Sequence, residues 1–212
     1  MPSMTSRQNP RAPVRASGWP APRMPRWVIA ALVLFLAACV AVALVHKPSQ
    51  AERASDMRGF LQEVNSDVES CAAGVSESLQ ALHAVQAEHY DSSQDVTNGI
   101  GVAQDGAENC GPANNEQIDD LQSYQVPESL DSFGLANAVN SLVQWAASDA
   151  AQVQTDVAAV LSATTAQARN RAEITLSKDL VTLHAQGVKA DSPIDKAIKA
   201  LAMHASAPRL PS

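Results

Sequence analysis

Residues 57–85, MRGFLQEVNSDVESCAAGVSESLQALHAV, decide the fold of this 212-residue chain. Their large apolar side chains recur at steps of three or four residues, the spacing that gathers them on one face of an α-helix. Ahead of them, Ser49 and Glu52 form the S-x-x-E pattern of a capping box, in which each side chain satisfies a free backbone N–H group. We therefore predict one long helix from about residue 50 to 90. Its apolar stripe consists of Met57, Leu61, Val64, Val68, Cys71, Val75, Leu79, Leu82 and Val85.

Helical spacing continues along the rest of the chain, with interruptions. Residues 95–110 keep the pattern, although their three glycines each weaken a helix by up to about 1 kcal/mol. A short helix is predicted from Ile118 to Tyr124. A second long helix is predicted over residues 128–168, with a kink near Ser148, and a further helix over 172–189.

The triplet Asp191-Ser192-Pro193 predicts the start of a separate last helix, because serine is a good N-cap and proline fits the first helical position. Aromatic residues make up only 4% of the chain, and no segment alternates apolar and polar residues as a strand does. These features predict an all-α fold, most simply an antiparallel helical bundle over residues 47–205, with a flexible C-terminus over 206–212.

The N-terminal part of the sequence has a different character. Residues 1–26 contain five arginines, six prolines and no acid, a composition that predicts a disordered cationic tail. The next nineteen residues, WVIAALVLFLAACVAVALV, carry no charge. As a helix they would span about 28 Å, close to the roughly 30 Å of a bilayer's hydrocarbon core. We therefore predict a transmembrane anchor over residues 27–46.

The same segment has two alternative interpretations. LAAC, residues 36–39, resembles the processing box of a bacterial lipoprotein, in which Cys39 would be lipidated, and a simple cleavable signal is the other alternative. Both are weakened by the apolar residues that continue beyond the cysteine to Val45. The excess of arginine before the segment favours a cytoplasmic N-terminus, so the expected location is a single pass through the cell membrane with the domain outside the cytoplasm.

The two remaining cysteines, Cys71 and Cys110, each lie on the apolar side of their own predicted helix. In an oxidising compartment an even pair of cysteines indicates a disulfide bond. The alternative is a pair of separate buried thiols. We predict the disulfide.

Charge is unevenly distributed along the chain, whose net charge is −7. Residues 59–168 contain sixteen acids and no lysine or arginine, which disfavours nucleic acid as a partner because phosphate would be repelled. The plain interpretation is a solvated face that keeps the domain soluble. The sharper one is a docking face for a basic envelope protein, or loose binding of divalent cations. The residues predicted to dock such a partner are Asp119, Asp120, Glu128 and Asp131.

Motifs for catalysis, cofactors or metals are not found in the sequence. It lacks E-x-x-H, C-x-x-C-H, a phosphate-binding glycine loop, the spacing of a calcium loop and a nucleophile motif. We therefore expect no catalytic residues, no cofactor and no metal site, and a non-enzymatic binding or structural role in the cell envelope. The alternative is a sensory or small-ligand-binding helical module that acts through a partner.

Two further stretches carry a resemblance: CGPANNEQIDDLQSYQVPESLDSF, Cys110 to Phe133, and SLVQWAASDAAQVQTDVAAVL, Ser141 to Leu161. They resemble a group of uncharacterised actinobacterial single-pass membrane proteins with a helical extracytoplasmic domain. The resemblance covers about residues 57–165. It implies a bacterial envelope setting and assigns no activity, cofactor or site residue.

Overall fold

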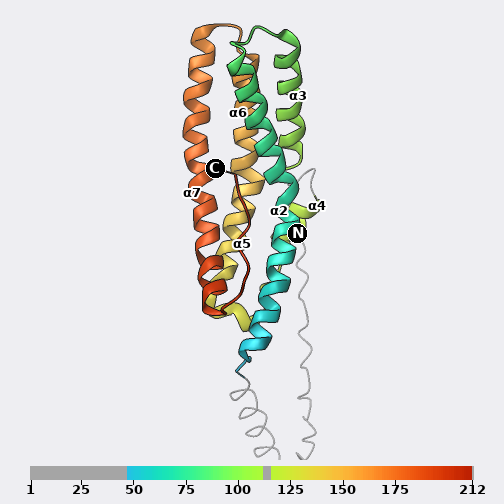
Figure 1. Ribbon diagram of the computed structural model, residues 1–212, viewed down its shortest axis with the longest axis vertical. Coiled ribbons are helices and arrows are strands. Elements are labelled where there is room, and N and C mark those ends of the chain that lie inside the picture. The colour runs from blue at the N-terminus through green and yellow to red at the C-terminus, as the bar shows by residue number, and fades with distance from the viewer. Residues whose placement is uncertain (1–46, 112–115, 212) are drawn as a thin grey trace, which may run out of the picture. The chain divides into compact units, whose positions relative to one another are not determined.

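The computed structural model describes residues 47–111 and 116–211. Over these residues the chain is helical and contains no strand, which confirms the all-α prediction. The residues from Pro48 onward form one compact unit. The helices of this unit pack side by side along a common direction (Figure 1).

The predicted membrane location is not supported by this fold. Within residues 47–111 and 116–211, no helix combines the length and the apolar character needed to cross a membrane. The tail 1–26 and the segment 27–46, including Cys39, lie outside the described residues. The prediction of a single-pass membrane protein is therefore corrected: the described chain contains no membrane-spanning helix.

The first described helix, α2 (Gln50–Ala87), is the long helix that the apolar stripe predicts. Its capping box is formed: the Glu52 backbone N–H donates to the Ser49 hydroxyl at 3.1 Å, and the Ser49 N–H donates to the Glu52 carboxylate at 3.3 Å. A turn reverses the chain into α3 (Ser93–Glu108), which runs back along α2 (Figure 1).

The segment predicted as a second long helix is divided. After α4 (Glu116–Ser123), a 3₁₀ turn, η1 (Glu128–Phe133), ends at Gly134, whose φ of 71° interrupts the helical path. The chain then runs continuously through α5 (Leu135–Gln144) and a π-helical segment, η2 (Trp145–Ala150).

The helical path continues from η2 into α6 (Ala151–Ser162). The kink predicted near Ser148 therefore falls where the hydrogen-bonding pattern changes from α to π. The full path α5–η2–α6 covers residues 135–162 and is shorter than α2.

The last helix, α7 (Ala166–Ala200), runs straight through Pro193, so the prediction of a separate final helix is wrong. A proline inside a helix costs roughly 3 kcal/mol. On either side of it, Ala190, Ile194 and Ala197 are fully buried. The burial of this apolar face offsets the cost of the proline, which local sequence signals cannot reveal.

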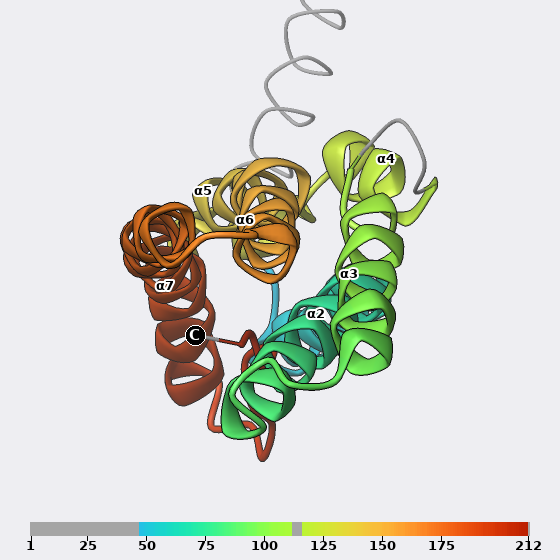
Figure 2. The same cartoon turned by 90° about the horizontal axis from the view of Figure 1, so that it is seen from above.

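Buried apolar side chains form two clusters along the bundle. One cluster joins the first half of α2 to α5 and the last third of α7. The other joins the second half of α2 to α3 and α6. Seen along the helices, α3 and α7 lie on opposite sides of the bundle (Figure 2).

The C-terminal segment completes the bundle between α2 and α7, which barely touch each other directly. Residues 202–211 run back between these two helices (Figure 1). Pro208 is buried, and Leu210 contacts both apolar clusters. This packing was not expected for residues 206–212, for which the sequence predicts flexibility.

Helices α2 and α3 approach each other closely at Gly74 and Gly106. A Cβ atom at Gly74 would lie 3.0 Å from the Gly106 Cα, so no larger residue fits without moving a backbone. Gln154 of α6 fills the remaining space: a Cβ at Gly106 would lie 3.0 Å from its Oε1 atom. The small residues therefore set the distance between α2 and α3.

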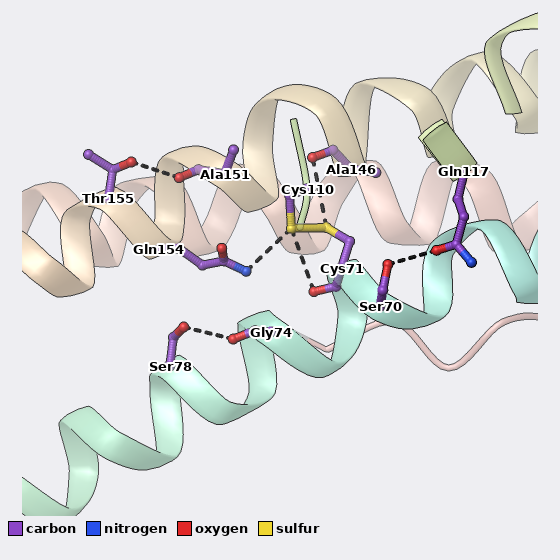
Figure 3. The surroundings of a disulfide bond; sticks show 10 residues. All are labelled: Ser70, Cys71, Gly74, Ser78, Cys110, Gln117, Ala146, Ala151, Gln154 and Thr155. Atoms are coloured by element: carbon purple, nitrogen blue, oxygen red, sulfur yellow. Dashed lines mark hydrogen bonds between the residues drawn. A yellow bond between two sulfur atoms is a disulfide. The ribbon is translucent and has the colours of Figure 1, made fainter. Parts of the chain in front are cut away.

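A disulfide bond joins the same two helices, as predicted. Cys71 and Cys110 are bonded, their Cα atoms are 4.6 Å apart and both residues are fully buried. The Gln154 side chain donates its Nε2–H to the Cys110 sulfur at 3.3 Å (Figure 3). The bond and the glycine crossing therefore hold α2, α3 and α6 together at one level of the bundle.

We predict that Gly74→Ala lowers the free energy of unfolding by about 1–3 kcal/mol, because the added methyl group meets the α3 backbone. Gly59→Ala, in the same helix, is the matched control: a Cβ there has nothing within 4 Å. Alanine should stabilise the helix at that position by up to about 1 kcal/mol. Denaturant unfolding of both variants checks the prediction, and equal effects would contradict it.

The paired replacement Cys71→Ala and Cys110→Ala should lower the free energy of unfolding by about 2–5 kcal/mol. The bond closes a loop with a sequence separation of 39 residues, so its loss increases the conformational entropy of the unfolded chain. Denaturant unfolding of the oxidised protein, the reduced protein and the double variant tests this. The reduced protein and the double variant should have equal unfolding midpoints. Midpoints equal to that of the oxidised protein would show that the bond adds no stability.

Candidate functional site

The four acids predicted to dock a partner are all exposed. Asp119 and Asp120 lie on α4, and Glu128 and Asp131 lie on η1. Both elements pack against α2, so the structure places the four acids on elements that share a neighbour. We call these four residues the acidic patch.

Helix α2 adds further acids beside the acidic patch. The Ser129 hydroxyl of η1 donates a hydrogen bond to the Asp56 carboxylate. Asp67 is only 5% exposed, and one of its carboxyl oxygens has no hydrogen-bond partner. The pKa of Asp67 is raised to about 6, first by burial and then by the negative charges of Glu63 and Asp120.

The phenol of Tyr124 reports the same negative environment. Its pKa is raised by burial first and then by the charges of Glu63, Asp56 and Asp67. No cation contributes to either of these two shifts. The surface where α2, α4 and η1 meet therefore gathers acids from more than one element.

The sequence could have revealed Asp67, though not its two acidic neighbours on α2. It falls among Val64, Val68 and Cys71, within the apolar stripe of the long helix. An acid at that helical position has to be buried or to distort the helix face. Asp56 and Glu63 give no such signal, because acids at exposed helix positions are ordinary.

A second group of carboxyls lies where α6 packs on α7. Asp156 is 6% exposed, and its pKa is raised to about 6 by burial and then by a carboxyl hydrogen bond with Asp179. Gln152 opposes this shift by donating its Nε2–H to Asp156 at 3.0 Å. Burial, and the charge of Asp179, also raise the pKa of Asp149.

Neighbouring carboxyls are common in active sites, so Asp156 and Asp179 are a candidate acid–base pair. Its small exposed fraction leaves Asp156 little access to a substrate. In residues 47–111 and 116–211, no group of three or more His, Cys, Asp or Glu side chains is arranged to hold a metal ion. The pair is best explained as a carboxyl hydrogen bond that joins α6 to α7.

The grooves on the surface are shallow and lie between helices. One of about 450 Å³ separates α2 from the C-terminal segment, and its lining includes Glu69 and Arg209. Two others, of about 270 and 300 Å³, follow the seam between α2 and α3. The acidic patch itself contributes no residue to these three grooves, so it offers a surface and not a pocket.

Comparison of the chain with protein-family models, with curated proteins and with solved structures found no match. The resemblance to actinobacterial membrane proteins stays a prediction.

We predict that the domain is more stable at pH 5 than at pH 7.5. Asp67 and Asp156 have pKa values of about 6 when folded, against 3.8 for an ordinary aspartate, so the folded state binds their protons more tightly. Their charging destabilises the fold as the pH rises from about 4 to 7, by on the order of 2 kcal/mol each. Unfolding measured across this pH range checks the direction.

Asp156→Asn keeps the side-chain volume and removes the charge. It should raise stability at pH 7.5 and reduce the pH dependence, because asparagine can still accept from Gln152 and donate to Asp179. Asp119→Asn is the matched control, since that residue is exposed. A stability that rises with pH in the wild type would contradict the assignment of these raised pKa values.

Proposed function

We propose that the helical domain is a non-enzymatic binding module that recognises a basic protein partner through the acidic patch. The observation that carries the proposal is the gathering of acids where α2, α4 and η1 meet: after burial, the charges of Glu63 and Asp120 raise the pKa of the nearly buried Asp67. Lysine or arginine side chains of a partner would neutralise these charges.

The placement of the acids supports recognition and not merely solubility. A solvated face does not require acids to be close enough to shift each other's pKa values. Here Asp120 of α4 and Glu63 of α2 both act on Asp67, although the two helices are distant in sequence. Such clustering destabilises the free protein, and a basic partner would recover that free energy on binding.

The arrangement of the large apolar residues also favours binding over catalysis. Most of them are buried in the two clusters between the helices. Ligand and substrate sites are usually concave and mostly apolar, with a few convergent polar groups. The acidic patch is instead an exposed surface on two short elements, which suits a partner of opposite charge.

The test is a replacement of the whole acidic patch: Asp119→Asn, Asp120→Asn, Glu128→Gln and Asp131→Asn. The probe is a 20-residue lysine-rich peptide, with a glutamate-rich peptide of equal length as its control. We expect the affinity for the basic probe at low salt to fall at least tenfold and its salt dependence to become shallower. Isothermal titration calorimetry measures both.

A second variant removes the same number of charges elsewhere: Glu69→Gln, Asp91→Asn, Glu108→Gln and Asp195→Asn. These residues are exposed and lie outside the acidic patch. The affinity of this control for the peptide should fall only two- to threefold. Equal losses in the two variants would mean that net charge, and not the acidic patch, attracts the probe.

A further inference from the structure

Two adjoining hollows follow the seam of α2 and α3. They measure about 270 and 300 Å³, and Val102 lines both. Small residues, Ala73, Ala81, Ala84 and Gly99, lie along them. We call the two hollows together the α2–α3 groove.

The α2–α3 groove carries two pairs of acids. Glu88 and Asp95 line one end, Glu77 and Asp105 lie near the middle, and Ser70 and Asn109 line the other end. The lining contains no lysine or arginine, and neither does any other part of residues 59–168. Between the two pairs of acids the lining is mostly apolar, which fits a helix that presents apolar residues and two bases spaced like the acids.

The chain itself presents such a helix face. The exposed large apolar residues of the described chain all lie on α7: Ile174 is 64% exposed, Val181 68% and Val188 53%. They are seven residues apart, so they form one stripe along the helix. Isolated exposed apolar residues are ordinary, whereas three in one line mark an unpartnered face.

Bases flank the α7 stripe between residues 174 and 189, where both acids have partners within the bundle. Lys178 and Lys189 are exposed beside the apolar residues. Glu173 accepts a hydrogen bond from Tyr90 at 3.4 Å, and Asp179 forms a carboxyl hydrogen bond with Asp156 of α6. The outward face from Ile174 to Lys189 is therefore apolar and basic, and the next acids, Asp191 and Asp195, follow beyond Val188.

The dimensions of the two surfaces agree. Lys178 and Lys189 are eleven residues apart, and so are Glu77 and Glu88 of the groove, which gives about 16 Å along each helix. The apolar stripe from Ile174 to Val188 is about 21 Å long, and the groove follows α3 over the same length. Apolar contacts and opposite charges can therefore be made together.

We propose that the α2–α3 groove receives the α7 stripe of a second copy of this chain. The two surfaces are different, and α3 and α7 lie on opposite sides of the bundle (Figure 2). The contact is therefore heterologous, and each molecule that joins offers a free groove or a free stripe to the next one. The assembly grows as an open chain of copies. It uses residues outside the acidic patch and does not depend on the proposed binding of a basic partner.

Two variants disable one surface each. Ala84→Arg places a cation in the α2–α3 groove, and Val181→Glu places an acid in the α7 stripe; both sites are exposed helix positions, so the fold tolerates the changes. Ala136→Arg on α5 and Thr155→Glu on α6 are controls with the same charge changes at exposed positions.

Sedimentation of the 212-residue chain at rising concentration measures the assembly. The wild type and both controls should grow beyond dimers, and high salt should weaken this growth. Either disabling variant alone should need at least tenfold higher concentration to associate. An equal mixture of the two should form a dimer and stop, because one intact groove meets one intact stripe.

The equal mixture of the two disabling variants distinguishes a groove–stripe contact from other ways in which two copies could associate. A wild type that stays monomeric, or disabling variants that associate as the wild type does, would overturn the proposal. So would a mixture that fails to recover dimers, because the stripe would then pair with another stripe. Peptide binding to the acidic patch should be unchanged in both disabling variants, so a failure here leaves the proposed function standing.

Discussion

The close crossing of α2 and α3 is the constraint on which the rest of the bundle depends. Both helices carry acids and, beyond Arg58, no lysine or arginine, so their electrostatic interaction is unfavourable. Contact between Gly74 and Gly106 allows dense packing in spite of this, and the neighbouring disulfide prevents separation. Gln154 then fixes α6 against the same level. The distance between α2 and α3 at this crossing determines how the two apolar clusters pack and how wide the α2–α3 groove is.

Three buried or half-buried aspartates have raised pKa values. Asp67, Asp156 and Asp191 all have pKa values of about 6, and in each case burial is the largest cause. Neighbouring carboxyls add to the shift in all three, and no base opposes it. A fold selected for stability alone would place apolar residues there. Their presence indicates that the negative charge of this domain extends into its helix junctions.

Much of the fold could be predicted from the sequence, because helical periodicity and capping are local. The start of α2, the existence of α3 and α4 and the cysteine pair follow from residues a few positions apart or from simple parity. Continuation of α7 through Pro193 could not be predicted, since it depends on partners in α5 and in the C-terminal segment. The four residues of the acidic patch were identified from composition, but Asp56 and Glu63 join them only through the packing of α4 and η1 on α2. The groove likewise requires two helices to meet, which no single stretch encodes.

The π-helical segment from Trp145 to Ala150 changes which faces of α5 and α6 point into the bundle. A π turn holds one residue more than an α turn, so everything after it is rotated by about 100° relative to an uninterrupted helix. Before this segment, α5 packs with α7 and α4, and after it, α6 packs with α3 and α7. One additional residue in the π turn therefore sets the rotation of α6 relative to α5. Loss or gain of one residue there would rotate α6 relative to α5. Related sequences could in this way vary their helix contacts without changing the number of helices.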